Sequence, residues 1–370
     1  MKSRTKQLES ANSVLLVTDN LKIGGVQKVV VRLAEALLKR GVRVGVAASP
    51  EGDLWQELPA GCNTYQIPGR NGIYSQIGRA RALRNIVKSN KYGIVHSHQR
   101  GITLEAKLAT TGLTTSIVEH VHNTFLPVTN ARASFRGKYL IACGSAIKQM
   151  LQDDYKRDPQ HIFTILNGVP DPLDGAIAAP VSAKSRNEPI KIIAVGRVSE
   201  QKNPHKFIDI IESLNQRQIS IQAEWVGDGE LLDQCRADVA RRDISNLVFS
   251  GSHSDVSAKL ARSDVLLLTS RWEGLPLVVL EAMSLGIGTI LPNVGSCKDA
   301  VDPWRNGILY PAEANADEIT DLIVGSMDHS VLHSWGSVSR TRYLASFTFD
   351  RMVDEVENVY AIANLEMSHR

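Results

Sequence analysis

The pattern that most constrains the fold of this chain is a repeated succession of short apolar runs and amphipathic helical segments. Val14 to Val17 is an apolar run of strand length, and residues 26–40 then place apolar side chains at helical spacing until Gly41 ends the helix. A second series of the same kind begins at Ile190. Strands that alternate with helices in this way predict parallel sheets covered by helices.

The length of the chain and the composition of its middle predict two domains. At 370 residues the chain exceeds the size at which a single core keeps growing. Residues 171–189 are rich in Pro, Ala, Ser and Asp and lack periodicity, which is typical of a linker. We therefore predict Rossmann-like α/β domains over residues 1–170 and 187–346. A helix within residues 347–370 is expected to pack back on the first domain.

Composition and motifs exclude several classes of protein. Hydrophobic residues make up 43% and charged residues 22% of the chain, and no apolar run approaches the roughly 20 residues of a membrane span, so we expect a cytoplasmic protein. The four cysteines have no paired spacing and suggest neither disulfides nor a cysteine metal site. The fingerprint G-x-G-x-x-G is absent, which disfavours a dehydrogenase.

The net charge of +3 conceals an uneven distribution along the chain. Residues 1–169 hold 23 basic and 11 acidic side chains, a balance of +12, whereas residues 170–370 hold 19 and 28, a balance of −9. A basic first domain could dock on anionic lipid or bind an anionic substrate, although a solvated basic surface explains the count equally. Nucleic acid is not expected as a partner, because no recognition motif or aromatic interleaving accompanies the charge.

Residues 75–90 are predicted to form a basic amphipathic helix. Ile77, Ala80, Leu83, Ile86 and Val87 share the apolar side, and Arg79, Arg81, Arg84 and Lys88 surround the other. Such a helix could lie on an anionic membrane surface, or it could pack on a sheet with its charges in water.

Two His-x-His pairs stand at the ends of predicted strands, at His96 and His98 and at His120 and His122. Alternation along a strand places each pair on one face. Four imidazoles could hold zinc, but no acidic partners accompany them, and no Asp-x-Asp is present to hold a divalent cation on a diphosphate. We expect no metal, and we predict that His122 is a hydrogen-bonding residue of the active site.

The apolar run from Val265 to Leu268 predicts a strand, and the stretch 270–286 that follows it predicts a tight turn and a helix start. Pro276 suits a first helical turn, and backbone N–H groups in such a turn, together with the helix dipole, favour an anion. Glu273 and Glu281 flank this point and could grip sugar hydroxyls. The alternative is that Glu273 is a carboxylate at a helix start and Glu281 a surface residue.

A second loop supplies positive charge. Gly196 and Arg197 follow a predicted strand directly, and Lys202 closes the same loop. Both cations can therefore face one anionic ligand at the carboxyl end of the sheet. In the first domain, the helix entry at Gly24 and Gly25 would let bare backbone approach a ligand.

These residues together resemble the large retaining glycosyltransferase family GT4, whose GT-B fold has two Rossmann-like domains facing across a cleft. The matching pieces span most of the chain. They are Gly24-Gly25, His122, Asn167-Gly168-Val169, Gly196-Arg197 with Lys202, Gly227-Asp228-Gly229, Glu273-Gly274-x-Pro276 through Glu281-Ala282-Met283, Gly295 to Asp299, and Asn306-Gly307.

The resemblance implies transfer of a sugar from a UDP- or GDP-sugar to a saccharide or lipid-linked acceptor, in cell-surface polysaccharide or glycolipid synthesis, without a metal cofactor. The catalytic residues it implies are Arg197 and Lys202, which would neutralise the leaving diphosphate, Glu273, which would hold the sugar hydroxyls, and His122, which would contact the transferred sugar. The donor-binding set further includes Gly24, Gly25, Gly196, Gly227, Gly274, Leu275, Leu277 and the ribose-binding Glu281. No protein nucleophile is implied.

Two departures from the family pattern put the donor sugar in doubt, namely Ser296 in place of a second glycine and Pro276 where glycine is commonest. Two alternatives stay open at this point. One is a UDP-sugar epimerase or a phosphorylase on the same fold, and the other is a sugar- or nucleotide-binding protein without chemistry.

Overall fold

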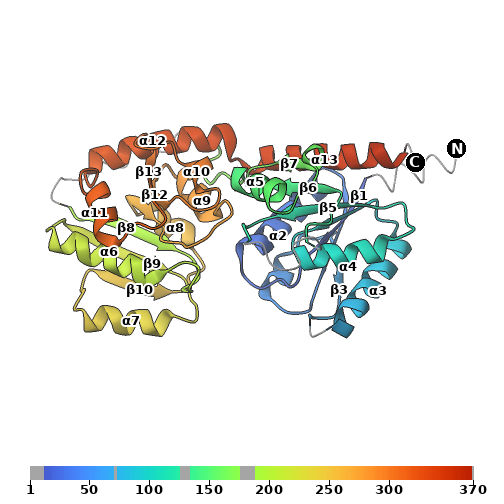
Figure 1. Cartoon of the computed structure of the whole chain (residues 1–370), viewed down its shortest axis with the longest axis horizontal. Coiled ribbons are helices and arrows are strands. Elements are labelled where there is room, and N and C mark those ends of the chain that lie inside the picture. The colour runs from blue at the N-terminus through green and yellow to red at the C-terminus, as the bar shows by residue number, and fades with distance from the viewer. Residues whose placement is uncertain (1–11, 71–72, 126–133, 176–187, 369–370) are drawn as a thin grey trace. The chain divides into compact units, whose positions relative to one another are not determined.

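The computed structural model describes residues 12–70, 73–125, 134–175 and 188–368. The chain divides into two compact units (Figure 1). Unit 1 comprises residues up to Leu166 together with residues from Asp350 onward, and unit 2 comprises Asn167–Phe349. The C-terminal segment therefore belongs to the same unit as the N-terminal half, although almost 200 residues separate them in sequence.

Unit 1 contains a seven-stranded parallel sheet in the order β3-β2-β1-β4-β5-β6-β7. Its central strands β1 and β4 are buried along their whole length, as is usual for a parallel sheet covered by helices on both faces. The strands are β1 (Ser13–Val17), β2 (Arg43–Ala48), β3 (Asn63–Gln66), β4 (Ile94–Ser97), β5 (Ser116–Val121), β6 (Tyr139–Ala142) and β7 (Ile162–Thr164). The helices are α2 (Gly25–Lys39), α3 (Ile73–Asn90), α4 (Arg100–Thr110), α5 (Ser145–Asp153) and α13 (Phe349–Ser368), with 3-10 turns at Asp53–Glu57 and Pro159–His161.

Unit 2 contains a six-stranded parallel sheet in the order β10-β9-β8-β11-β12-β13. The strands are β8 (Ile190–Val195), β9 (Ile221–Val226), β10 (Leu247–Gly251), β11 (Val265–Leu267), β12 (Gly288–Pro292) and β13 (Gly307–Tyr310). The helices are α6 (Pro204–Gln216), α7 (Leu232–Arg241), α8 (Val256–Ala261), α9 (Leu277–Ser284), α10 (Cys297–Ala300), α11 (Ala316–Val324) and α12 (His329–Ser346).

Both sheets reverse their strand order at an equivalent place, and the predicted fold class is confirmed. In unit 1 the reversal lies between β1 and β4, and in unit 2 between β8 and β11. Loops that leave the carboxyl ends of such neighbouring strands diverge to opposite faces of the sheet, which opens a crevice where α/β proteins bind ligands. The loops after β8 and β11 carry the candidate cations and the turn at Glu273, so topology brings these segments together.

The prediction for the charged side of helix α3 is wrong at Arg79. Its side chain is completely buried, whereas Ile77, predicted on the apolar side, is 49% exposed. The Arg79 guanidinium donates to Glu105 Oε2 at 2.7 Å and to the Pro68 carbonyl at 2.7 Å. The reason is that α3 packs against α4, which carries the buried Glu105, and an internal carboxylate requires a paired cation.

Two helix starts also differ from expectation. Serine is a common N-cap residue, so the sequence predicts Ser145 as the cap of α5, but Gly144 occupies the N-cap and Ser145 is the first helical residue. Pro276 is the N-cap of α9 and not its first helical residue, with φ of −66°. These shifts of one residue arise because neither N-cap side chain bonds to the helix, so local sequence contains no capping signal.

Glu119 on β5 provides a pH-dependent prediction for unit 1. Its side chain is completely buried, which raises its pKa to about 7, although the Gly137 N–H bonds to Oε2 at 2.9 Å. The folded state therefore holds the proton more tightly than the unfolded state, whose carboxyl has the ordinary pKa of 4.5. Accordingly, the free energy of unfolding should fall as the pH rises from about 4.5 to about 7.

Replacement Glu119→Gln removes this ionisation at nearly constant volume. We expect the variant to exceed the wild type in free energy of unfolding at pH 8 by up to about 3 kcal/mol, and to match it near pH 4.5. Calorimetric unfolding of both proteins at the two pH values measures the difference. An equal gain at both values would mean that packing, not ionisation, controls the effect.

Candidate active site

Two loops of unit 2 are joined by hydrogen bonds at the point where the strand order reverses. The Arg271 N–H donates to the Gln201 carbonyl at 2.8 Å, and Gln201 Nε2 donates back to the Trp272 carbonyl at 2.9 Å. Thr269 Oγ1 adds a bond to the Lys202 carbonyl at 2.9 Å. The loop after β8 and the loop after β11 are thereby fixed to each other.

Lys202 and Glu273 meet across these two loops. Lys202 Nζ forms a hydrogen-bonded ion pair with Glu273 Oε1. The exposed fraction of the Lys202 side chain is 19% and that of Glu273 is 7%, so the ammonium group retains access to solvent while the carboxylate is almost enclosed. An ion pair at such a surface can share its cation with an incoming anion.

Gly196 and Arg197 flank the ammonium group on the same loop. Gly196 adopts φ of +154°, and a methyl group placed there would lie 3.3 Å from Lys202 Cε. The aliphatic part of Lys202 therefore runs over bare backbone. Arg197 is exposed, and its guanidinium makes no hydrogen bond or ion pair within the part of the chain that the structure describes. Lys202 is therefore paired with Glu273, whereas Arg197 has no partner among the described residues.

Gly227 supports this loop from the neighbouring strand. Its φ is +145°, and a Cβ atom there would lie 2.0 Å from the Gly196 carbonyl oxygen, closer than any real contact. The same carbonyl accepts a hydrogen bond from Trp225 Nε1 at 3.0 Å. Gly227 is therefore a structural requirement of the loop, and its backbone lies against Gly196.

The turn after β11 is held from a third side by the segment at Gly295. A Cβ at Gly295, whose φ is +52°, would lie 1.9 Å from the Glu273 carbonyl oxygen. The N–H of the buried Ser296 donates to the Gly274 carbonyl at 2.9 Å. Ser296, which stands in place of a second glycine, is therefore buried in this turn, and its N–H is hydrogen-bonded there.

The remaining donor-site candidates of unit 2 lie on or beside this turn. The buried Leu275 offers its carbonyl to Asn167 Nδ2 at 2.9 Å. Leu277, the first residue of α9, is half-buried, and Glu281 lies half-buried along the same helix. Sequence reasoning did not single out Gln201 or Thr269, because a polar residue inside a loop has no periodic signal.

In unit 1, Gly24 is the N-cap of α2 and Gly25 its first residue. Gly24 has φ of −174°, which any residue can adopt, and the nearest atom that a Cβ there would meet is the movable end of Gln27. The internal packing of unit 1 therefore does not require glycine at position 24.

His122 follows β5 and stands beside three other histidines. His96 and His98 come from β4 and its end, and His120 is on β5, so the four rings lie on one face of the sheet as alternation predicts. His98 Nδ1 lies 3.0 Å from His122 Nε2. Burial lowers the pKa of His122 to about 3, so its imidazole is neutral at physiological pH.

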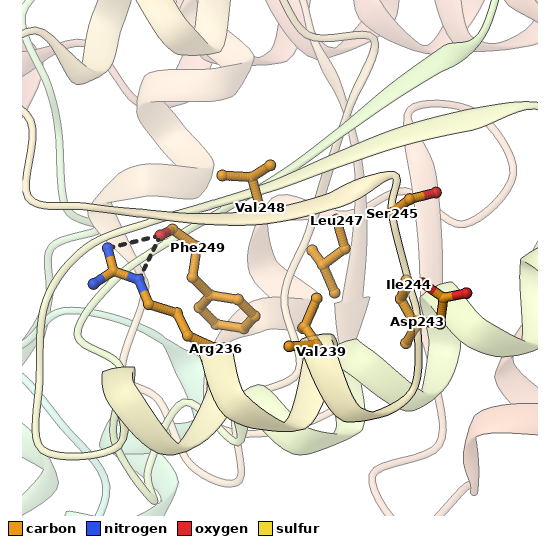
Figure 2. Close-up of a pocket in the computed structure, with 9 residues that line it drawn as sticks. Arg236, Val239, Asp243, Ile244, Ser245, Leu247, Val248 and Phe249 are labelled. Carbon is orange, nitrogen blue, oxygen red and sulfur yellow. Dashed lines mark hydrogen bonds between the residues drawn. The ribbon is translucent and has the colours of Figure 1, made fainter.

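A surface cavity of about 310 Å³ lies elsewhere in unit 2, between α7 and β10 (Figure 2). Arg236 lines it and donates from Nε and Nη2 to the Phe249 carbonyl, at 3.1 and 2.9 Å. Val239, Leu247 and Val248 make the rest largely apolar. None of the predicted site residues lines this cavity, so it is not the candidate site.

The fold and these loops define a class of protein, namely two-domain enzymes of the GT-B fold. The structure of the Anabaena protein Alr3699/HepE in complex with UDP matches with a TM-score of 0.79 at 17% identity, over 94% of this chain and 99% of that one. The lipopolysaccharide outer core galactosyltransferase WaaB matches with a TM-score of 0.76 at 20% identity, over 94% and 98%.

Sequence profiles then identify the family. Residues 23–171 match Glycosyltransferase Family 4, and residues 178–329 match Glycosyl transferases group 1. A curated relative, the UDP-Gal:alpha-D-GlcNAc-diphosphoundecaprenol alpha-1,3-galactosyltransferase of Escherichia coli, is 24% identical over 97% of this chain and 98% of its own. The chain belongs to the GT4-type glycosyltransferases and is a glycosyltransferase, so the family prediction is confirmed.

Proposed function

We propose that this glycosyltransferase moves a sugar from a UDP-sugar to a lipid-linked saccharide with retention of anomeric configuration. The observation that carries the proposal is the meeting of Lys202 and Glu273 where the strand order of unit 2 reverses, with the unpaired Arg197 on the same loop. Two cations suit a diphosphate, and a carboxylate suits sugar hydroxyls. Support for UDP comes from the Anabaena neighbour, solved with UDP and with UDP-glucose, and from the UDP-Gal donor in the name of the Escherichia coli relative.

Each candidate residue then has a chemical role. Arg197 and Lys202 stabilise the negative charge that grows on the diphosphate as the glycosidic bond breaks, and thereby replace a divalent metal. Glu273 accepts hydrogen bonds from hydroxyls of the transferred sugar, and Glu281 accepts them from the ribose. The N–H groups of Gly274, Leu275 and Leu277 face the phosphates or the sugar. In unit 1, Gly24 and Gly25 offer bare backbone to the donor, and His122 contacts the sugar.

The proposed step needs no protein nucleophile. The bond between the anomeric carbon and the diphosphate oxygen breaks, and a bond to the acceptor hydroxyl oxygen forms on the same face of the sugar. The hydroxyl proton passes to the leaving phosphate oxygen. The products are the glycosylated acceptor and UDP, and the α configuration of the donor is kept.

The acceptor class is proposed from relatives of related function. Their names include a Vi polysaccharide biosynthesis protein of Salmonella typhi and a putative colanic acid biosynthesis glycosyltransferase of Salmonella typhimurium. The Escherichia coli relative acts on a sugar linked to diphosphoundecaprenol. We infer that this chain extends a cell-surface polysaccharide or glycolipid at the inner face of the cytoplasmic membrane.

The test is an assay with radiolabelled UDP-galactose, UDP-glucose and UDP-N-acetylglucosamine, GlcNAc-diphosphoundecaprenol as acceptor, and EDTA present throughout. We expect label in the lipid fraction, equimolar release of UDP and an α linkage by NMR. Interconversion of UDP-sugars without transfer would indicate an epimerase. Tight binding of every donor without release of UDP, with this and other lipid-linked acceptors, would indicate a binding protein.

Membrane attachment is proposed for the exposed faces of α3 and α4, which pack side by side (Figure 1). Within the described residues no helix is long and apolar enough to cross a bilayer. On α4, Leu104 is 42% and Leu108 is 58% exposed beside the exposed Lys107, and α3 adds the exposed Arg81 and Lys88. Exposed leucines among lysines and arginines suit the interface of an anionic bilayer.

For this surface we expect the double variant Leu104→Ser/Leu108→Ser to bind liposomes containing phosphatidylglycerol about tenfold or more weakly than the wild type, since two apolar side chains no longer enter the bilayer. Flotation at low and at high salt measures binding. Val248→Ser, which removes a side chain of 56% exposure in unit 2, is the matched control and should bind normally. Binding that is equal for neutral and anionic lipid would contradict the proposal.

A further inference from the structure

The four histidines of unit 1 form a stack of nearly parallel rings. The centroids of His120 and His122 are 4.0 Å apart with 20° between the ring planes, and those of His96 and His98 are 4.3 Å apart with 31°. His98 and His122 are 5.3 Å apart with 16° between them. His96, His98 and His120 are almost fully buried, and burial lowers the pKa of each, so the stack is neutral.

This arrangement differs from a metal centre, although ligand atoms of His96, His98 and His120 lie within 4.8 Å of one another. An imidazole nitrogen coordinates a metal through a lone pair in the plane of its ring. His96 and His120 are stacked, with ring planes parallel within 1° and centroids 5.6 Å apart, so their in-plane lone pairs lie in separate parallel planes and do not meet at one point. The feature of the stack that bears on function is a hydrogen bond between two of its members, His98 and His122.

That bond joins His98 Nδ1 to His122 Nε2 at 3.0 Å, and its proton can belong to either residue. If the His98 proton were on Nε2, that N–H would be buried with no hydrogen-bond partner among the described residues. If the proton is on His98 Nδ1, it is donated to His122, and only an acceptor at Nε2 is left without such a partner. Neutral His120, whose two ring nitrogens both lack a partner among the described residues, already places one such donor in the stack, and a second would add a further desolvation cost.

We propose that His98 is a positioning residue that donates from Nδ1 to His122 Nε2 and thereby fixes His122 as the Nδ1–H tautomer. His122 then presents a hydrogen-bond donor, not an acceptor, at Nδ1, the ring nitrogen that is not bonded to His98. The chemical class it recognises is an oxygen acceptor, such as a hydroxyl or carbonyl oxygen of the transferred sugar. The part that concerns the sugar rests on the proposed function, whereas the tautomer is a property of the free enzyme.

Proton positions can be measured directly in the unliganded full-length chain. Histidine-selective ¹⁵N labelling and long-range ¹H–¹⁵N correlation spectra separate the two tautomers of each of the ten histidines, and the spectrum of His122→Gln assigns the signal of His122. We expect a protonated Nδ1 and an unprotonated Nε2 at His122. A protonated Nε2 at His122 would overturn the inference whatever the enzyme does.

Three variants test whether the tautomer of His122 affects the rate of sugar transfer. His98→Phe keeps the ring and the stack but removes the donor, so we expect a mixture of tautomers at His122 and a kcat about fivefold to tenfold lower, with a smaller change in KM. His98→Asn restores an N–H at the position of Nδ1 and should recover most of the loss. His120→Phe, which alters the neighbour stacked on His122 without touching the hydrogen bond, should preserve the tautomer.

The outcomes separate the two proposals. An unchanged tautomer in His98→Phe would overturn the positioning role of His98 even if activity fell. A changed tautomer with wild-type kcat on a sugar acceptor would instead remove His122 from the proposed reaction and leave the hydrogen-bond assignment standing. If His98→Phe fails to fold, the wild-type spectrum and His98→Asn still decide the matter.

Discussion

Replacement Arg197→Ala should lower kcat for sugar transfer by about 10²- to 10³-fold, about 3 to 4 kcal/mol of transition-state stabilisation, without lowering the melting temperature. The expected loss is large because, in the proposed reaction, Arg197 stabilises the negative charge that grows on the diphosphate. Stability should not change, because the guanidinium is exposed and has no partner among the described residues. Release of UDP, measured with saturating donor and acceptor, provides kcat, and thermal unfolding provides the melting temperature.

Lys202→Ala should reduce kcat as strongly but also destabilise unit 2. Removal of the ammonium takes away the ion-pair partner of the Glu273 carboxylate, which is only 7% exposed, and loss of one member of an almost enclosed ion pair is costly. The double variant Lys202→Ala/Glu273→Gln removes that charge. We expect it to regain most of the lost stability and none of the lost activity, which separates the structural role of the pair from the catalytic one.

Arg241→Ala is the matched control for both experiments. Arg241 lies on α7 of the same unit with 73% of its side chain exposed, so its loss removes a positive charge but no predicted ligand contact. It should retain wild-type kcat. Near-wild-type turnover in both Arg197→Ala and Lys202→Ala would refute the assignment of these cations to the diphosphate.

Gly227→Ala should destabilise unit 2 by about 3 to 5 kcal/mol, a large effect for a single methyl group. The added Cβ would lie 2.0 Å from the Gly196 carbonyl oxygen, and φ of +145° is strained for any side chain. Backbone on both sides must move, because the obstacle is not a flexible side chain. The displaced segment is the loop that carries Arg197 and Lys202, so transfer should be lost as well.

Tryptophan fluorescence during denaturation is suited to this measurement. Four of the five tryptophans, at positions 225, 272, 304 and 335, belong to unit 2, so the signal reports mainly on that unit. Gly24→Ala in unit 1 is the contrasting variant, because the methyl group there meets only the end of Gln27. It should keep wild-type stability while weakening donor binding. Equal stability of Gly227→Ala and the wild type would show that the loop around Gly196 is not held as described.

The sequence predicted the strands of both sheets well because their residues are buried on both faces. A fully buried parallel strand is a continuous apolar run, and β1 from Val14 onward and β11 have this pattern. The runs in β4 and β8 are mainly apolar but include His96 and Ser97 in the first and the exposed Lys191 in the second. Helices α4, α10, α11 and α12 and strand β3 were missed. Strand β3 lies at the edge of its sheet and exposes most of its side chains, so it lacks an apolar pattern.

For the candidate site, the sequence identified residue types and their order but not their partners. It placed Arg197 and Lys202 on one loop, yet the ion pair from Lys202 to Glu273 depends on hydrogen bonds between two loops about 70 residues apart. Arg79 was misjudged for the same reason. Its charge is neutralised by Glu105 on another helix, and helical spacing within α3 cannot reveal that contact.

The division of unit 1 between the two ends of the chain affects how the protein is made. Tyr360 near the C-terminus hydrogen-bonds His96 at 2.6 Å, and Arg40 contacts Asp354 and Glu357, each at 2.5 Å. On the ribosome, the N-terminal 166 residues must therefore wait for the last twenty before these contacts form, whereas unit 2 is continuous and can complete its fold earlier. A chain truncated after Phe349 and released from the ribosome should accordingly have a protease-sensitive unit 1 and a resistant unit 2.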